Sequence, residues 1–139
     1  MDNKIKHLEM IENVIQRMAS NSFQLKGWAV TLVTILGGLS AAGSDKRFIL
    51  VSFIPCLAFW FLDSYYLQLE RKFRCLYKKV VTLSEDQIDF CMDMKNIQYS
   101  AEDAKRTCYC KCLFSASECG FYLPICAAIV LLAFFLKVI

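Results

Sequence analysis

The apolar residues of this chain are gathered into three runs that contain no charged residue. The runs cover residues 27–44, 48–62 and 119–136, and charged residues flank each of them. A membrane-spanning helix needs about 20 largely apolar residues, with about 17 as the lower limit. The first and third runs are long enough, and the second can span if Asp63 lies near one membrane interface. The pattern predicts about three transmembrane helices.

The composition is too apolar for a small soluble domain. Hydrophobic residues make up 57% of the 139 residues and charged residues 21%, and a chain of this length forms one domain. One small core cannot enclose three such runs, and the polar, helix-periodic N-terminus does not fit a signal peptide. No stretch shows the alternation of a strand. We therefore predict an all-α integral membrane protein.

Lysine and arginine are distributed unequally around the three runs. Of the 16 Lys and Arg residues, four precede the first run, nine lie between the second and third, and three lie at the opposite ends of the runs. By the positive-inside rule, the N-terminus and the central segment are cytoplasmic and the C-terminus is outside. The 8 cysteines fit this orientation, because most of them would then lie in a reducing compartment or within lipid.

The segment before the first run has an amphipathic pattern. Its apolar residues recur at helical spacing, at Leu8, Ile11, Ile15 and Met18. This narrow stripe favours packing against another helix or subunit over a helix that lies on lipid. Asn21 and Ser22 are typical N-cap residues, so we expect the first transmembrane helix to begin there. The tight turn at residues 42–46 makes the first two spans an antiparallel hairpin.

The helical pattern of the second run continues past Leu62 to Val80 and predicts one long helix. Residues 64–83 hold five Lys or Arg against one Glu, and residues 84–103 hold six Asp or Glu against one Lys, which favours their pairing. Ser84 begins a capping-box pattern that predicts a new helix. Ser100 precedes Glu102 and Asp103 and is a candidate start for a further short helix.

These elements divide the chain into four regions. They are an N-terminal amphipathic cytosolic helix at residues 1–26, a transmembrane hairpin at 27–67, a cytosolic helical region at 68–118 and a C-terminal transmembrane helix at 119–139. The cytosolic region is expected to form a small helical hairpin.

Groups suited to catalysis or metal binding are few. His7 is the only histidine and precedes every arginine, so neither an Arg–His ribonuclease motif nor a histidine-based catalytic pair is supported, and no glycine-rich phosphate loop occurs. Four cysteines near the third run are spaced poorly for a structural zinc site, at Cys108, Cys110, Cys112 and Cys119. We expect no enzyme activity, no metal and no cofactor.

Two features of the apolar runs are candidates for function. Small and polar residues share one helix face in the first run, at Thr31, Thr34, Gly38 and Ala41, and this face either packs closely against another helix or lines a pore. Asp63 is the second candidate, because an ionisable residue at the end of an apolar run needs a partner, water or a pore. The alternative is that Asp63 lies just beyond the hydrocarbon and pairs locally.

A basic face follows the second run and comprises Arg71, Arg74, Lys78 and Lys79. Anionic lipid headgroups are the usual partners of such a cluster beside a membrane. A phosphate-bearing regulatory ligand is the alternative partner.

Two segments resemble a family of short bacterial membrane proteins: NSFxLKGW at residues 21–28 and FWFLDxYYLxxERxFR at residues 59–74. The layout of a transmembrane hairpin and a small charged cytosolic part is similar to that of membrane effectors in prokaryotic anti-phage systems. The resemblance implies a multi-pass inner-membrane protein that forms a homo-oligomeric pore. Thr31 and Thr34 would line its path, Asp63 would lie at its cytoplasmic mouth, and the basic face would meet a nucleotide, oligonucleotide or protein trigger. The competing hypothesis is an accessory membrane protein that recruits a cytosolic partner without forming a pore.

Overall fold

The computed structural model describes residues 2–43, 45–94 and 100–138, and its regular elements over these residues are all helical. The elements are α1 (Asp2–Ala41), α2 (Phe48–Val51), α3 (Phe53–Thr82), the 3-10 turn η1 (Glu85–Gln87), α4 (Ala101–Arg106), α5 (Tyr109–Leu113) and α6 (Ala116–Phe135). The all-α prediction is confirmed for this part of the chain.

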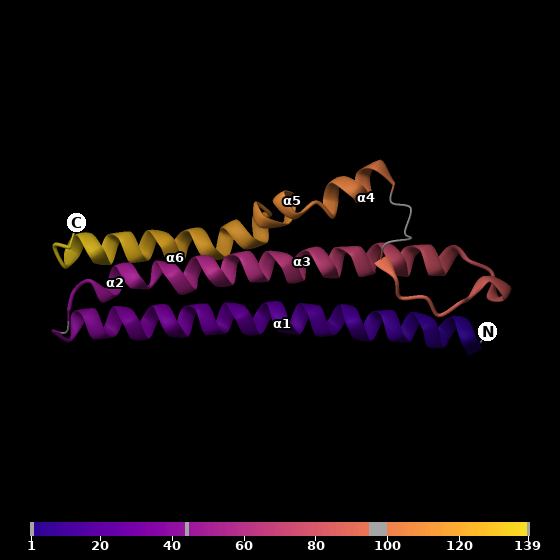
Figure 1. The fold of residues 1–139 in the computed structure, drawn as a ribbon, viewed down its shortest axis with the longest axis horizontal. Helices are drawn as coiled ribbons and strands as arrows, with labels where there is room; N and C mark the ends of the chain where they lie inside the picture. Colours follow the sequence, from indigo (N-terminus) through magenta and orange to yellow (C-terminus); the bar gives the residue numbers. More distant parts are fainter. Residues whose placement is uncertain (1, 44, 95–99, 139) are drawn as a thin grey trace.

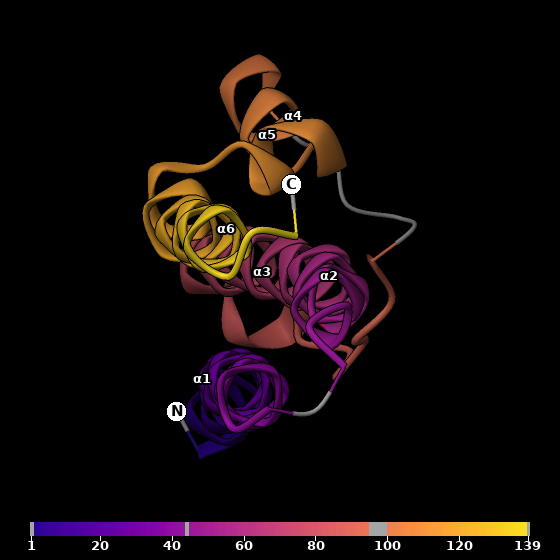
Figure 2. The ribbon, with the colours of Figure 1, turned by 90° about the vertical axis from the view of Figure 1, so that its left-hand side faces the viewer.

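Three long helices lie side by side in the molecule (Figure 1). α1 and α3 run antiparallel along most of their lengths, and α6 lies beside α2 and the first part of α3. Viewed along the helices, α3 lies between α1 and α6, while α4 and α5 lie on the outer side of α3 (Figure 2). One end of the molecule is therefore a three-helix bundle, and the other end is mainly the α1–α3 pair.

α1 is one uninterrupted helix of 40 residues, so the expected helix start at Asn21 and Ser22 is wrong. Ser22 lies within α1, where its Oγ accepts a hydrogen bond of 3.1 Å from Lys26 Nζ one turn later. A serine whose hydroxyl has such a partner is compatible with a helix interior, and no Gly or Pro interrupts the chain there. The boundary between regions 1–26 and 27–67 therefore does not coincide with a helix end.

The second apolar run is helical, as predicted. α2 and α3 follow one another with an interruption at Ser52, three residues before Pro55, which lacks the N–H that would bond to the Val51 carbonyl. α3 then continues to Thr82, well beyond the apolar run. The prediction of one long helix through Asp63 is confirmed.

The segment after α3 differs from the prediction. Instead of a new helix from Ser84, there is only the three-residue turn η1, and Ser84 makes no side-chain capping bond. Within residues 83–94, the side chains of Ile88, Met92 and Met94 pack against the α1–α3 pair. These apolar contacts outweigh the local helix signal. The prediction at Ser100 is confirmed, because its hydroxyl accepts from the Asp103 N–H at 3.2 Å and caps α4; residues 95–99 lie outside the described range.

Among the described helices, two are long and apolar enough to cross a membrane: Phe48–Thr82 and Ala116–Phe135. The apolar part of α1 does not belong to this set. Its Gly, Thr and Ser residues make it less hydrophobic than the other two runs. It nevertheless lies beside them in the same bundle (Figure 1).

The molecule has two separate cores. The core of the three-helix end, which we call the apolar half, comprises Ala29, Ile49, Cys56, Tyr122, Ile129 and Ala133. The core of the other end, the polar half, comprises Ile11, Leu76 and Val80. The outer surface of the apolar half remains hydrophobic: Leu131 is 69% exposed and Phe134 is 74% exposed. This surface is suited to contact with lipid tails.

Candidate functional site

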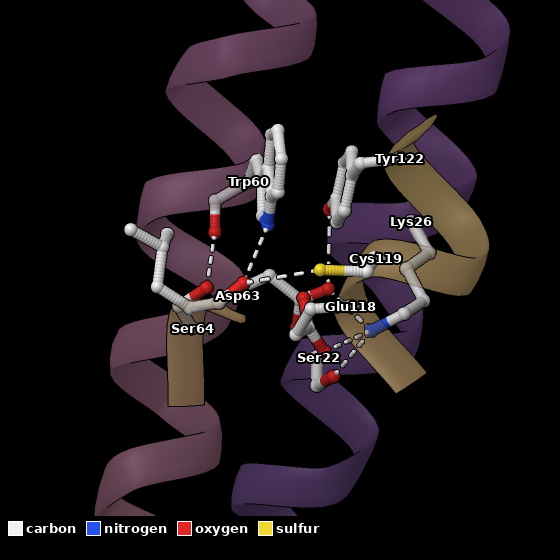
Figure 3. Close-up of polar contacts among 9 residues, drawn as sticks. Ser22, Lys26, Trp60, Asp63, Ser64, Glu118, Cys119 and Tyr122 are labelled. Carbon is white, nitrogen blue, oxygen red and sulfur yellow. Dashed lines mark hydrogen bonds and ion pairs between the residues drawn. The ribbon is translucent and has the colours of Figure 1, made fainter. Parts of the chain in front are cut away.

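A buried ionic cluster joins the three long helices at the junction of the two halves (Figure 3). α1 contributes Lys26, α3 contributes Asp63 and α6 contributes Glu118. Lys26 Nζ forms an ion pair with Asp63 Oδ2 and lies 3.1 Å from Glu118 Oε1. We call these three residues the triad. One ammonium group thus bridges two carboxyl groups from helices that are distant in the sequence.

Aromatic side chains enclose the triad on the side of the apolar half. The Tyr122 hydroxyl donates to Asp63 Oδ2 at 3.1 Å, and the Tyr122 ring stacks on Trp60 with 5.8 Å between centroids. Trp60 Nε1 in turn donates to the Leu113 carbonyl at 3.1 Å and fastens the end of α5 to α3. These contacts, visible in Figure 3, hold the triad in a defined geometry.

The triad is almost closed to solvent. Asp63 is 0% exposed and Glu118 is 1% exposed, whereas the Lys26 side chain is 18% exposed. One oxygen of each acid, Asp63 Oδ1 and Glu118 Oε2, is buried and has no hydrogen-bond partner in the described part of the chain. Buried charges are stable only when they are paired and bonded. The triad therefore satisfies part, but not all, of its bonding capacity.

The structure does not place Asp63 on an outer face, where a pore between chains would need it. Its carboxyl group points into the chain's own core, toward Lys26 and Tyr122. The local pairing that the sequence left open as the alternative is what the structure contains. Sequence reasoning did not identify Glu118 or connect Lys26 to Asp63. The available signal was that each of these residues directly borders an apolar run at the same end of the bundle.

The other proposed pore residues lie on the outside of α1. Thr31 is exposed, and its hydroxyl donates to the Gly27 carbonyl at 2.9 Å within the same helix. Thr34 and Gly38 line a shallow, mainly apolar groove of about 470 Å³ between α1 and α6, together with Ile125 and Leu132. This face is accessible to lipid or to another helix, and the described chain leaves it uncovered.

A second candidate site lies in the polar half, between α3 and α4. A groove of about 380 Å³ is lined by Arg71, Arg74, Cys75, Lys78, Asp103, Arg106 and Thr107. We call this the basic groove. It holds three of the four residues predicted for the basic face and adds Arg106, which the sequence did not indicate because α4 is distant along the chain. Four cations face one carboxylate there, so the groove favours anions.

Lys79 does not belong to the basic groove. It lines a different pocket of about 290 Å³ together with His7, Gln87 and Asp89. His7 is 1% exposed and packs against Phe90 with 5.4 Å between ring centroids. A one-residue step rotates the side chain by about 100° around a helix, so Lys79 points in a different direction from Lys78, which lines the groove.

Bonds within the basic groove connect α3 to the segments that precede α6. Arg71 Nη1 donates to the Arg106 carbonyl at 3.0 Å and to Cys112 Sγ at 3.6 Å. Burial raises the pKa of the Cys112 thiol, and the Arg71 guanidinium opposes that rise. Arg74 pairs with Glu70 at 2.8 Å on the same helix. Arg71 is thus the link between the groove and α5.

The described cysteines are all free thiols. Cys108 and Cys110 are exposed, whereas Cys112 is buried. No group of three or more His, Cys, Asp or Glu side chains in the described ranges is arranged to hold a metal ion.

Comparison with protein-family models, curated proteins and solved structures finds no match to this chain.

Proposed function

We propose that this chain is a multi-pass protein of the bacterial inner membrane that assembles into a homo-oligomeric pore controlled by an anionic ligand. The observation that carries the proposal is the basic groove, where Arg71, Lys78 and Arg106 converge from two helices. Arginine binds phosphate oxygens through paired N–H donors and is suited to such a task. The groove supports a phosphate-bearing trigger, either a soluble one or a lipid headgroup.

The apolar half supports a membrane-spanning role. α6 has 20 residues, or about 30 Å of helix, which matches the hydrocarbon core of a bilayer. In our proposal the apolar part of α1 crosses beside it, as the third span. Trp28 and Tyr65 are 60% and 48% exposed near the triad, where aromatic rings suit a membrane interface. The excess of Lys and Arg on the other side of the triad favours a cytoplasmic N-terminus.

The bonds of Arg71 suggest how an anion would act on the membrane part. Arg71 holds the end of α4 and Cys112 of α5, and α5 is followed closely by α6. A phosphate group that binds Arg71 would compete for these bonds and loosen α5 and the start of α6. A ligand that prefers the loosened arrangement would shift the population toward it.

A conducting path would have to form between chains, because the core of a single chain is filled. Tyr122, Ile129 and Ile49 occupy the centre of the apolar half and are fully buried. The Thr34 and Gly38 face of α1 borders the uncovered apolar groove, and small residues of this kind let helices from two copies approach closely. This face is the proposed contact or lining surface of the oligomer.

The test uses the full chain reconstituted in phosphatidylcholine vesicles, with ion flux as the readout. One arm adds a nucleotide or oligonucleotide, and the other adds phosphatidylglycerol to the membrane. We expect one arm to open the pore and Arg106→Glu to weaken the response about tenfold or more, as expected for the loss of one charge-assisted contact. Lys105→Glu, on the neighbouring exposed residue of α4, is the control and should respond normally.

The accessory-protein hypothesis rests on a different observation. The α1–α3 pair continues well beyond the triad into the polar half (Figure 1), which suits a docking arm. Oligomeric state in detergent separates the two hypotheses. A ring of identical chains favours the pore, whereas a stable monomer that conducts no ions in either vesicle arm contradicts it.

A further inference from the structure

The charges of the triad do not balance. Asp63 and Glu118 are two acids within a buried cluster, and Lys26 is the only cation that bonds to either of them in the described part of the chain. With both acids ionised, the cluster would hold one uncompensated negative charge away from water. Such a charge is strongly unfavourable in a low-dielectric site.

The unpartnered oxygens point to the missing component. Asp63 Oδ1 and Glu118 Oε2 are buried and accept no hydrogen bond from the described residues. An ionised carboxylate is only an acceptor, whereas a protonated carboxyl group has an O–H that donates. One added proton would therefore cancel the excess charge and convert one of these oxygens into a donor. No group of three or more His, Cys, Asp or Glu side chains suited to a metal ion occurs in the described ranges, so a proton fits the site better than a metal ion.

We propose that Asp63 and Glu118 share one exchangeable proton, and that this proton holds α6 against the α1–α3 pair. When the site is loaded, one carboxylate has taken a proton from water and become a neutral carboxyl group. When it is emptied, the proton returns to water and the negative charge remains. Exchange takes place beside Lys26, whose side chain is the part of the triad that reaches the surface.

The surroundings are consistent with this assignment. From α6, Tyr122 donates to Asp63 Oδ2, and the Cys119 thiol lies near the Leu113 carbonyl at 4.0 Å. From α5, Cys112 lies near Arg71, which bonds away from the triad. From α1, Ser22 accepts from Lys26. Arg71 is the one cation among these neighbours, and its printed bonds go to Arg106 and Cys112 and not to either acid, so we assign the remaining charge balance of the triad to the shared proton.

The shared proton does not depend on the existence of a pore. If the pore exists, loss of the proton would loosen α6 at the same place where we propose that ligand binding acts. Alkaline conditions on the cytoplasmic side would then favour the loosened arrangement. If the pore does not exist, the proton still controls how firmly α6 is held in the bundle.

Infrared difference spectroscopy tests the proposal on the full chain in vesicles, by following the C=O stretch of protonated carboxyl groups while the pH is raised. We expect the wild-type chain to show this band at neutral pH and to lose it at alkaline pH. Glu118→Gln and Asp63→Asn should each lack the band, because either change leaves one acid paired with Lys26. Glu102→Gln, at an exposed position on α4, should keep it.

Two further results keep the test decisive if one variant folds poorly. Lys26→Met should move the loss of the band to more alkaline pH, because removing the cation favours protonation. Circular dichroism on every variant identifies those that keep the helical fold. The proposal is overturned if folded Glu118→Gln or Asp63→Asn has the same carboxyl band as the wild type, or if the wild type has no such band at neutral pH.

Discussion

The two halves of the molecule distribute polar and apolar side chains in opposite ways. In the polar half, Ile11, Leu76 and Val80 point inward and the charged residues face outward. In the apolar half, Leu131 and other large hydrophobic residues cover the outer surface. Two charged side chains at the border of that half, Asp63 and Glu118, are buried. The helices of the polar half therefore have an apolar inner face and a polar outer face. In the apolar half, large hydrophobic residues occur on both the inner and the outer faces.

The difference shows what holds each half together. Water drives apolar side chains of the polar half into a common core. Lipid tails give no such drive between helices, so association depends on packing and on polar contacts between helices. The triad supplies such contacts from all three long helices at once. We therefore expect the apolar half to depend on a few polar residues and the polar half on its apolar ones.

Loss of the triad cation should have the largest effect. Lys26→Met leaves two buried acids without a positive partner, and breaking a buried pair in this way costs about 4 kcal/mol. Chemical unfolding in detergent measures the change in the free energy of unfolding. Arg17→Met, at an exposed position on the same helix, should change it by less than about 0.5 kcal/mol. Similar values for the two variants would mean that the triad does not stabilise the bundle.

Truncation of leucine side chains should distinguish the two halves. Leu76 is 5% exposed in the polar core, so Leu76→Ala should lower the free energy of unfolding by about 3 kcal/mol. Leu131 is 69% exposed on the apolar half, and Leu131→Ala should cost less than about 0.5 kcal/mol in detergent, because its surroundings stay apolar after unfolding. A large loss for Leu131→Ala would place this residue in an interface instead of in contact with lipid.

Thiol labelling should give the smallest and most local effect. Cys108 and Cys110 are exposed, whereas Cys112 is buried and its pKa is raised by that burial. Since the thiolate is the reactive form, Cys112 should react slowly with maleimide at neutral pH and faster as the pH rises. Mass spectrometry of the labelled peptides measures the rates, and equal rates at all three cysteines would contradict the burial.

Prediction from sequence succeeded where a local pattern and the tertiary contacts agree. The helix through Asp63 and the cap at Ser100 follow from patterns that nothing else in the molecule opposes. The helix expected from Ser84 is not formed, because packing of Ile88 and Met92 on the α1–α3 pair stabilises a different backbone path. The helix start expected at Ser22 is not formed either, because Lys26 supplies a partner for the Ser22 hydroxyl within α1.

The sequence by itself determined the helical class, the three uncharged runs and the charges that border them, because these depend on residue type and spacing alone. It also marked Asp63 as a residue that needs a partner. Only the tertiary structure decided that this partner is Lys26, that Glu118 shares it, and that Arg106 completes the basic groove. These contacts join positions that are far apart in the chain. No periodic pattern specifies how the three apolar runs rotate to face one another.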